Sequence, residues 1–284
     1  MKFDFQDNLT RIENLKNYQK NNYTFLKSKD GLSIIILNLD KPEYILPLIK
    51  VLKDAKREFE NENLFFEIII GDTGSKDERV LNLYKDPEIS VVKGLKYHFS
   101  KNNNAVAFSE SKASFLLFMN NDIIFEDKMF LLNLYKQATL DDSVGIVGHV
   151  LLFENRTIQH RGINFFELKS GRDFMPYHID GTKKKEDLNI PPCVEFDSTT
   201  GAFLMIKRDL FQEVNGFNED YEKEAQDIDL CLQVRRLGYK IQVFNLAEVF
   251  HFENGTRRKG EESNFDRSLF VRLWSSFIQG ILLN

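Results

Sequence analysis

The stretch LLFMNNDIIF (residues 116–125) decides the fold. An apolar run is followed by two amides and an acid, and a second apolar run comes after them. Because unpaired polar groups are costly inside a protein, Asn120, Asn121 and Asp122 are expected where a buried strand ends and opens onto solvent, a ligand or a metal ion. A plain strand-to-helix turn would also explain them, since Asn and Asp favour turns and caps.

Length and charge indicate a globular protein that does not bind nucleic acid. The 284 residues suit one α/β domain of about 200–250 residues with added arms. The chain carries 38 basic and 43 acidic residues, whereas a general nucleic-acid binder carries a strong basic field. Cys193 and Cys231 form no CxxC pair, which favours a reducing compartment. With no apolar signal core and no run of about 18 apolar residues, a cytoplasmic location is expected.

Apolar runs and helical stripes alternate from residue 31 onward. Strands are expected at 32–37, 64–72, 89–92, 114–119, 144–153, 198–206 and 239–244. Helices are expected at 42–59, 100–112, 126–139 and 225–238, together with a short helix ending near Tyr84 that a capping box of Ser75 and Glu78 opens. This alternation implies βαβ units and a mostly parallel central sheet flanked by helices. The pattern fails over 154–196, where a loop-rich region is expected.

Polar side chains follow three of these strands. Asn38 and Asp40 come after the first strand, Asp72 after the second, and the triplet 120–122 after the fourth. Because ligands of such sheets bind beyond the carboxyl ends of the strands, these side chains are expected to meet in one crevice. Asp122 is the candidate ligand for Mg²⁺ or Mn²⁺, which need few protein ligands when a diphosphate supplies oxygens.

Three further residues have both a chemical and an ordinary structural interpretation: Asp227, His251 and Arg257. Asp227 and Asp229 open a helix, where carboxylates cap free N–H groups and suit the helix dipole. The same position keeps Asp227 ionised as a general base. His251 is either a structural histidine or a neutral metal ligand. Arg257 suits planar recognition of a phosphate, although a solvated basic loop would explain it equally.

Other catalytic patterns are excluded. GDTGSK (71–76) lacks the spacing of a phosphate-binding P-loop. No GxGxxG follows the first strand, and no GxSxG nucleophile elbow is present.

The order and spacing of the motifs resemble glycosyltransferase family 2, the inverting nucleotide-sugar transferases of GT-A fold, from about Leu32 to Arg258. The first half of the resemblance lies in LSIIILNLDKPEYI (32–45), FEIIIGDTGSKD (66–77), HFSKNNNAVAFSES (98–111) and LLFMNNDIIF, which takes the place of the family's D-x-D motif. TIQHRGI (157–163), residues 197–220, QDIDLCLQVRRLGYKI (226–241) and VFHFENGTR (249–257) resemble a subgroup associated with bacterial surface polysaccharides.

The resemblance implies a role for each matching residue. Asp122 and His251 would hold a divalent cation, Mn²⁺ or Mg²⁺, and Asp227 would be the catalytic base. Donor contacts would come from Asn38, Asp40, Asp72, Lys101, Asn104, Asn120, Asn121 and Arg257. The acceptor side would carry Thr200, Gly201 and Gln226. Two departures stand out: the D-x-D place holds one acid, and many relatives carry Glu where this chain has Gln226.

The resemblance also implies the reaction. It predicts a metal-dependent inverting hexosyl- or deoxyhexosyl-transferase that moves a sugar from a UDP- or dTDP-sugar to a glycan or lipid-linked acceptor in O-antigen or capsule synthesis. A non-catalytic nucleotide-sugar-binding or scaffold protein stays open as an alternative, because Asn replaces Asp at 120 and 121. A sugar nucleotidyltransferase is a weaker alternative, because ILNLDKPE (36–43) holds no Gly-rich phosphate loop.

Three parts of the chain are expected: an N-terminal arm (1–30), a GT-A domain (31–260) and a C-terminal amphipathic helix (261–284). The apolar stripe of that helix consists of Phe270, Leu273, Trp274, Phe277, Ile278 and Ile281. It would pack on its own domain, pair with a second copy in a homodimer, or place 265–284 on the inner face of the plasma membrane. The chain is also compatible with one module of a longer protein.

Overall fold

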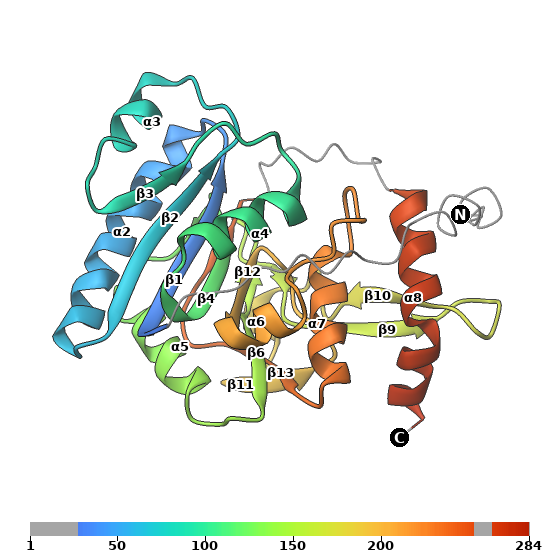
Figure 1. The fold of residues 1–284 in the computed structure, drawn as a ribbon. Coiled ribbons are helices and arrows are strands. Elements are labelled where there is room, and N and C mark those ends of the chain that lie inside the picture. Colours follow the sequence, from blue (N-terminus) through green and yellow to red (C-terminus); the bar gives the residue numbers. More distant parts are fainter. Residues whose placement is uncertain (1–27, 253–262, 284) are drawn as a thin grey trace.

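The computed structural model describes residues 28–252 and 263–283 (Figure 1). Most of the expected N-terminal arm and the loop with Arg257 lie outside the described residues. The expected division at residues 31 and 261 stays a prediction.

A sheet of eight strands in the order β11-β13-β6-β12-β4-β1-β2-β3 forms the centre of the fold. The strands are β1 (Lys29–Asn38), β2 (Phe65–Asp72), β3 (Ile89–Val92), β4 (Ala113–Asn120), β6 (Val144–His149), β11 (Cys193–Phe196), β12 (Phe203–Lys207) and β13 (Lys240–Phe244). The pairs β1–β2, β1–β4, β2–β3 and β6–β13 are parallel, whereas β12 runs antiparallel to β4 and β6. The expected α/β class is therefore confirmed, with antiparallel pairings around β12 and between β11 and β13.

Helices cover both faces of this sheet (Figure 1). They are α2 (Pro42–Asn61), α3 (Glu78–Leu83), α4 (Phe99–Glu110), α5 (Phe130–Ala138), α6 (Arg208–Glu213) and α7 (Gln226–Arg236), whereas α8 (Asn264–Leu282) lies to one side of the sheet. Successive side chains of a strand point to opposite faces. Ile34 and Ile36 accordingly join the core under α2 and α5, while Ile35 joins the core under α4, α6 and α7. The fold is thus a three-layer α/β/α arrangement.

The region 154–196, expected to be loop-rich, contains short strands. They are β8 (Ile158–His160), β9 (Ile163–Glu167), β10 (Phe174–His178) and the sheet strand β11. β9 and β10 form a hairpin, and β8 belongs to a small sheet of order β5-β14-β7-β8, with β5 (Ile123–Ile124), β7 (Leu151–Leu152) and β14 (Phe250–His251). Strands of two to five residues are too short to give a clear period in the sequence.

The capping box expected at Ser75 and Glu78 is wrong. Asp77 caps α3 instead, and its side chain accepts the N–H of Arg79 at 2.9 Å. The Ser75 hydroxyl accepts the N–H of Asp40 at 2.8 Å, so it connects two loops rather than starting a helix.

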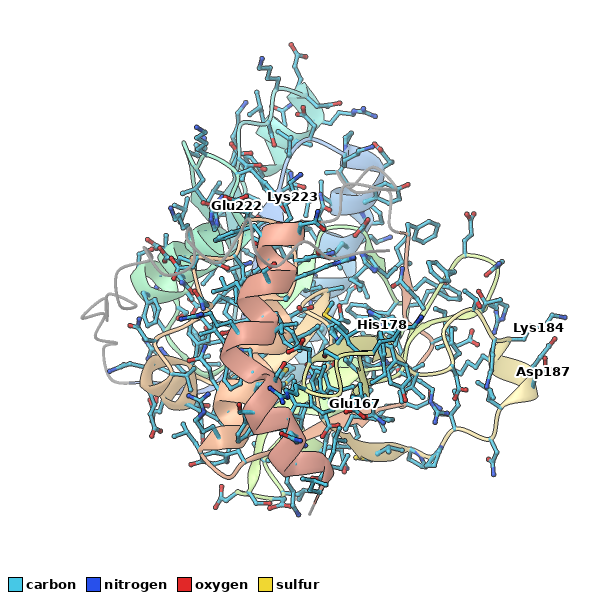
Figure 2. All side chains as sticks on the ribbon, turned by 90° about the vertical axis from the view of Figure 1, so that its right-hand side faces the viewer. Glu167, His178, Lys184, Asp187, Glu222 and Lys223 are labelled. Carbon is cyan, nitrogen blue, oxygen red and sulfur yellow. The ribbon has the colours of Figure 1, made fainter. Side chains whose placement is uncertain are left out.

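The C-terminal helix α8 packs on its own domain, the first of the three expectations for its apolar stripe, whereas the homodimer and the membrane contact stay predictions. Phe270, Trp274 and Ile278 are buried with residues of β9, β10 and α7. Leu273 stays 43 % exposed on the outer side. Figure 2 looks onto α8, with Glu167 and His178 of the β9–β10 hairpin beside it. Among the helices described, none is both long and apolar enough to cross a membrane.

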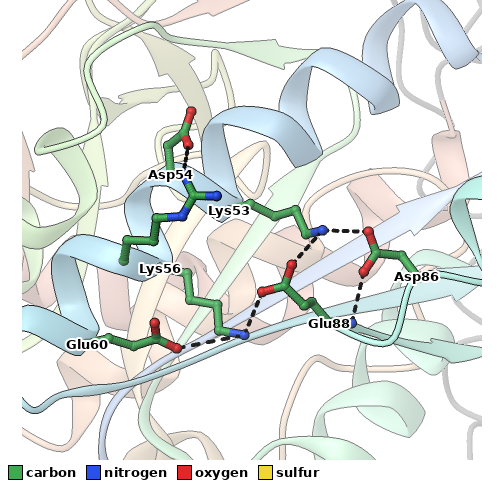
Figure 3. Close-up of polar contacts among 7 residues, drawn as sticks. Lys53, Asp54, Lys56, Glu60, Asp86 and Glu88 are labelled. Atoms are coloured by element: carbon green, nitrogen blue, oxygen red, sulfur yellow. Dashed lines mark hydrogen bonds and ion pairs between the residues drawn. The ribbon is translucent and has the colours of Figure 1, made fainter.

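Ion pairs link α2 to the chain just before β3 (Figure 3). Lys53 Nζ lies 2.5 Å from Asp86 and 2.6 Å from Glu88, and Lys56 Nζ lies 3.2 Å from Glu88. Exposed pairs of this kind add little stability, but several together hold one geometry better than one alone.

A buried carboxylate joins α7 to α8. Asp229 is 1 % exposed and accepts hydrogen bonds from Trp274 Nε1 at 2.7 Å, Gln233 Nε2 at 2.6 Å and Tyr221 Oη at 3.2 Å. Burial raises the pKa of Asp229 to about 6, although these donors act in the opposite direction. The folded protein therefore holds a proton at Asp229 at pH values where the unfolded chain has released it.

We expect the D229N variant to gain stability relative to the wild type as the pH rises. Protonated Asp229 supports the fold below about pH 4, and this contribution is lost as the pH rises through about 6. Since one pKa unit corresponds to about 1.4 kcal/mol, the difference in unfolding free energy should shift by about 3 kcal/mol between pH 4 and pH 7. Urea unfolding measures it, with D209N on the exposed side of α6 as the control. A difference that does not change with pH would contradict the assignment.

Candidate active site

The carboxyl ends of β1 and β4 bring the first polar residues together. The two strands are parallel, with Leu37 opposite Asn120. Just beyond this pair, Asn121 Nδ2 donates to Asn38 Oδ1 at 2.7 Å. Asn38 Nδ2 in turn lies 2.9 Å from the hydroxyl of Tyr84, whose pKa burial raises to about 12. The amides therefore form one ordered edge, as expected from the sequence.

This edge is one wall of a cavity of about 870 Å³. Of the residues singled out in the sequence, nine line it: Asn38, Asn120, Asn121, Asp122, Thr200, Gly201, Gln226, Asp227 and His251. Asp122 and Asp227 lie more than a hundred positions apart in the chain, yet both face this cavity. The expected convergence of strand-end residues in one crevice is confirmed for Asn38, Asn120, Asn121 and Asp122.

The first cluster in the cavity consists of Asp122 and His251. β5 and β14 are antiparallel with His251 opposite Ile123, which brings the imidazole beside the preceding residue, Asp122. His251 Nε2 lies 3.2 Å from Asp122 Oδ1 and 3.1 Å from Asn120 Nδ2. Both Asp122 and His251 are buried.

Gln159 orients this histidine, and no sequence motif pointed to it. Its Oε1 lies 2.6 Å from His251 Nδ1, and its Nε2 donates to the backbone oxygen of His251 at 3.3 Å. Since Gln159 Oε1 can only accept, this contact places a proton on His251 Nδ1. His251 Nε2 faces Asp122 and Asn120. Metal-binding histidines are commonly held through the second nitrogen in this way.

Asp122 and His251 fit a divalent cation as two of its ligands. Oxygen and imidazole nitrogen suit Mn²⁺, and a diphosphate can supply further oxygens. Over residues 28–252 and 263–283, no three His, Cys, Asp or Glu side chains converge as a complete metal site. Within these ranges, the cation would therefore have two protein ligands.

The second cluster surrounds Asp227 at the start of α7. Asp227 Oδ2 accepts the N–H of Gly201 at 2.6 Å, and Oδ1 accepts the N–H of Ile228 at 2.9 Å. The N-terminus of a helix also favours the ionised carboxylate. These two hydrogen bonds fix the Asp227 carboxylate at the cavity wall.

Gln226, next to this carboxylate, is 4 % exposed. Its Nε2 has no hydrogen-bond partner within the described part of the chain. A buried amide donor without a partner is costly, so it is a position where a bound ligand oxygen would be favourable.

Two expected donor residues hold the turn after β2 instead of lining the cavity. Asp40 Oδ1 accepts the N–H groups of Lys76 at 2.6 Å and Asp77 at 2.7 Å. The Asp72 carboxylate accepts N–H groups from Gly74 and Ser75 and the hydroxyl of Tyr84. These carboxylates fasten the 73–77 turn and are not among the residues that line the cavity, so the expected convergence does not extend to them, and their contact with the donor stays a prediction.

The expectation for α4 also needs correction. Asn104 is 1 % exposed, and its amide exchanges hydrogen bonds with the backbone of Phe217, 2.9 Å from N to Oδ1 and 2.8 Å from Nδ2 to O. It anchors a distant loop, which removes it as a donor contact. Lys101 is exposed and lies outside the cavity lining, whereas its neighbour Asn103 lines it. Arg257 lies outside the described residues.

The fold and the cavity define a class of protein. An α/β/α domain with polar residues at the carboxyl edge of its sheet has the architecture of a nucleotide-sugar transferase of GT-A fold. The crystal structure of GalNAc-T7 with UDP, GalNAc and Mn²⁺ matches 88 % of this chain and 49 % of its own, with a TM-score of 0.65 at 13 % identity. The crystal structure of a mycobacterial protein matches 82 % of this chain and 70 % of its own, with a TM-score of 0.51 at 17 % identity.

The family follows from the sequence comparison. The pattern of the "Glycosyltransferase like family" matches residues 88–274, and the chain belongs to this family. The O-antigen biosynthesis protein RfbC of Myxococcus xanthus is 25 % identical over 80 % of this chain, which spans 18 % of that protein's length. The rhamnosyltransferase WbbL of Escherichia coli is 25 % identical over 86 % of this chain and 90 % of its own. The O-antigen chain rhamnosyltransferase WbaN of Salmonella anatum is 26 % identical over 72 % of this chain and 62 % of its own.

We expect the G201A variant to lose transferase turnover. A Cβ at residue 201 would lie 3.1 Å from Asp227 Cβ and 3.1 Å from Phe99 Cζ, so both side chains would have to shift by a few tenths of an ångström. Displacing a catalytic group by up to an ångström costs up to about 100-fold, so we expect kcat to fall about 10- to 100-fold. Steady-state kinetics with a nucleotide-sugar donor measure the change. G280A on α8, where a Cβ meets nothing within 4 Å, is the matched control; equal rates for both variants would contradict the expectation.

Proposed function

We propose that this chain is an inverting glycosyltransferase that moves a sugar from a nucleoside-diphosphate donor to a hydroxyl of a glycan or lipid-linked acceptor in surface-polysaccharide synthesis. The observation that carries the proposal is that Asp122 and Asp227 face one cavity of about 870 Å³. Family membership and the relatives named for O-antigen synthesis support it. Because three relatives are named rhamnosyltransferases, a deoxyhexose is our proposed sugar. A cytoplasmic location is part of the proposal.

Asp227 acts as the base in the proposed reaction. The acceptor hydroxyl oxygen attacks the anomeric carbon of the donor sugar, while the bond from that carbon to the diphosphate oxygen breaks. The bonding pair leaves with the diphosphate, and the hydroxyl proton goes to Asp227. The Gly201 N–H donates to one oxygen of the Asp227 carboxylate. This hydrogen bond fixes the orientation of the carboxylate. One displacement inverts the anomeric configuration.

Negative charge grows on the leaving diphosphate in this reaction. Asp122 and His251 would hold a divalent cation, which would neutralise that charge. Asn38, Asn120 and Asn121 offer amide groups at the same cavity wall, where they can hydrogen-bond the donor without adding charge. The Arg257 contact to the diphosphate, which falls outside the described residues, remains part of the proposal.

We expect D227N to abolish transfer while donor binding persists. The amide keeps the shape of the side chain but cannot take the proton, so kcat should fall about 1,000-fold. Turnover is measured with a panel of UDP- and dTDP-sugars that includes dTDP-rhamnose, and donor affinity by calorimetry. E213Q on the exposed side of α6 is the control. A D227N enzyme that turns over at the wild-type rate would overturn the assignment of the base.

We expect D122A to weaken donor binding only when Mn²⁺ is present. The carboxylate is one of two protein ligands, and its loss should raise the donor dissociation constant about tenfold or more. Calorimetric titrations with and without Mn²⁺ give this difference directly. E126A, an exposed acid four residues further on, is the control. Unchanged Mn²⁺-dependent affinity in D122A would refute the cation site.

A non-catalytic nucleotide-sugar-binding protein is the second candidate. The observation that favours it is the single acid in the 120–122 triplet, where Asn120 also contacts His251. Donor binding without release of nucleoside diphosphate, in wild type and D227N alike, would support this candidate. Formation of pyrophosphate would instead support a nucleotidyltransferase.

A further inference from the structure

Asp266, in the first turn of α8, is a fully buried carboxylate directed at the segment before Asp227. Its Oδ1 accepts the N–H of Glu222 at 2.9 Å. Its Oδ2 accepts the N–H groups of Lys223 at 2.7 Å and Glu224 at 3.0 Å. Figure 2 labels Glu222 and Lys223 at this end of α8. Three successive backbone donors on one carboxylate make a strong, charge-assisted clamp.

The Asp266 carboxylate does not cap α8, although an acid at this position of a helix often does. Ser263 caps α8, and its hydroxyl accepts the N–H of Asp266 at 3.1 Å. In a capping box the acid at this position would bind the N–H of the cap residue. Here the N–H of Ser263 donates to Glu224 Oε1 at 3.0 Å, and Arg267 Nε donates to the same oxygen at 3.0 Å. The polar groups at the N-terminal end of α8 are therefore directed at residues 222–224.

The clamped segment ends in a strained residue. Ala225 has φ 71° and ψ 2°, which is the left-handed region that residues other than glycine rarely adopt. Such a conformation persists only when the surroundings hold it. Gln226 and Asp227 come next and both line the cavity, so the backbone at Ala225 sets the direction in which they enter it.

We infer that Asp266 is a positioning residue for sugar transfer. Its carboxylate holds residues 222–224, which keeps Ala225 left-handed and aims Asp227 at the acceptor hydroxyl. Asp266 does not line the cavity and reaches it through this segment. The inference rests on the proposed function and adds to it that α8 is a part of the catalytic apparatus.

The test compares D266N with S263A. The amide introduced by D266N keeps the size of the side chain but loses the charge and presents an NH₂ group to backbone donors. We expect kcat to fall about 10- to 100-fold while the dissociation constant of the nucleotide-sugar donor, measured by calorimetry, changes less than about threefold. S263A weakens the same helix end by removing its cap but keeps the carboxylate, so its kcat should stay within about twofold of wild type.

Two results would overturn the inference. One is a D266N enzyme with wild-type kcat. The other is a loss that is not specific to positioning: either S263A loses kcat to the same extent, or D266N also binds the donor more weakly. If D266N does not fold, D266E takes its place: it keeps the charge, but the added methylene displaces the carboxylate, and the same loss confined to kcat is expected.

A rescue and an exchange measurement separate positioning from stability. Glycine adopts the left-handed region without steric cost, so A225G added to D266N should restore kcat about fivefold. Amide hydrogen exchange at residues 222–224 should be faster in D266N than in wild type and unchanged in S263A. An absence of rescue together with unchanged exchange would refute the clamp. If the wild type transfers no sugar, the proposed function fails, whereas the exchange result still decides whether Asp266 holds the segment.

Discussion

The parallel pairing of β1 with β4 is the constraint on which the whole site depends. Its register sets Leu37 opposite Asn120, so the residues that follow the two strands emerge at the same edge of the sheet. The hydrogen bond between Asn38 and Asn121 is a direct result. The second half of the chain adds to this edge: β14 brings His251 to Asp122, and α7 brings Asp227 to the same cavity.

The sequence predicted the parts of the structure that depend on local pattern and on strand direction. Apolar runs such as 32–37 and 114–119 are buried on both faces, and a run of this kind has no other stable place than a central strand. Once those strands are parallel, the convergence of Asn38, Asn120 and Asp122 follows from geometry alone. The family resemblance added Asp227 and His251, which no local pattern could have brought to the same cavity.

The errors concern contacts between residues distant in the chain. Asn104 looked available for a ligand, but its partner Phe217 lies 113 residues away and leaves no mark near Asn104 in the sequence. Gln159 and His251 are likewise 92 residues apart. Asp40 and Asp72 stand at the correct edge, but backbone N–H groups of the next turn use their oxygens. Position at a strand end can be predicted, whereas the competition for each polar atom depends on tertiary packing.

The ion pairs beside β3 bear on the tendency of the protein to aggregate in a concentrated solution. Among the described strands, β3 is the outermost on its side of the sheet, and an edge of this kind can template pairing with another molecule. The strand is only four residues long, and Lys53, Lys56, Asp86 and Glu88 surround its entrance with charge. A hydrated charged rim of this kind discourages a foreign strand from docking, so this rim protects the open border of the sheet from aggregation.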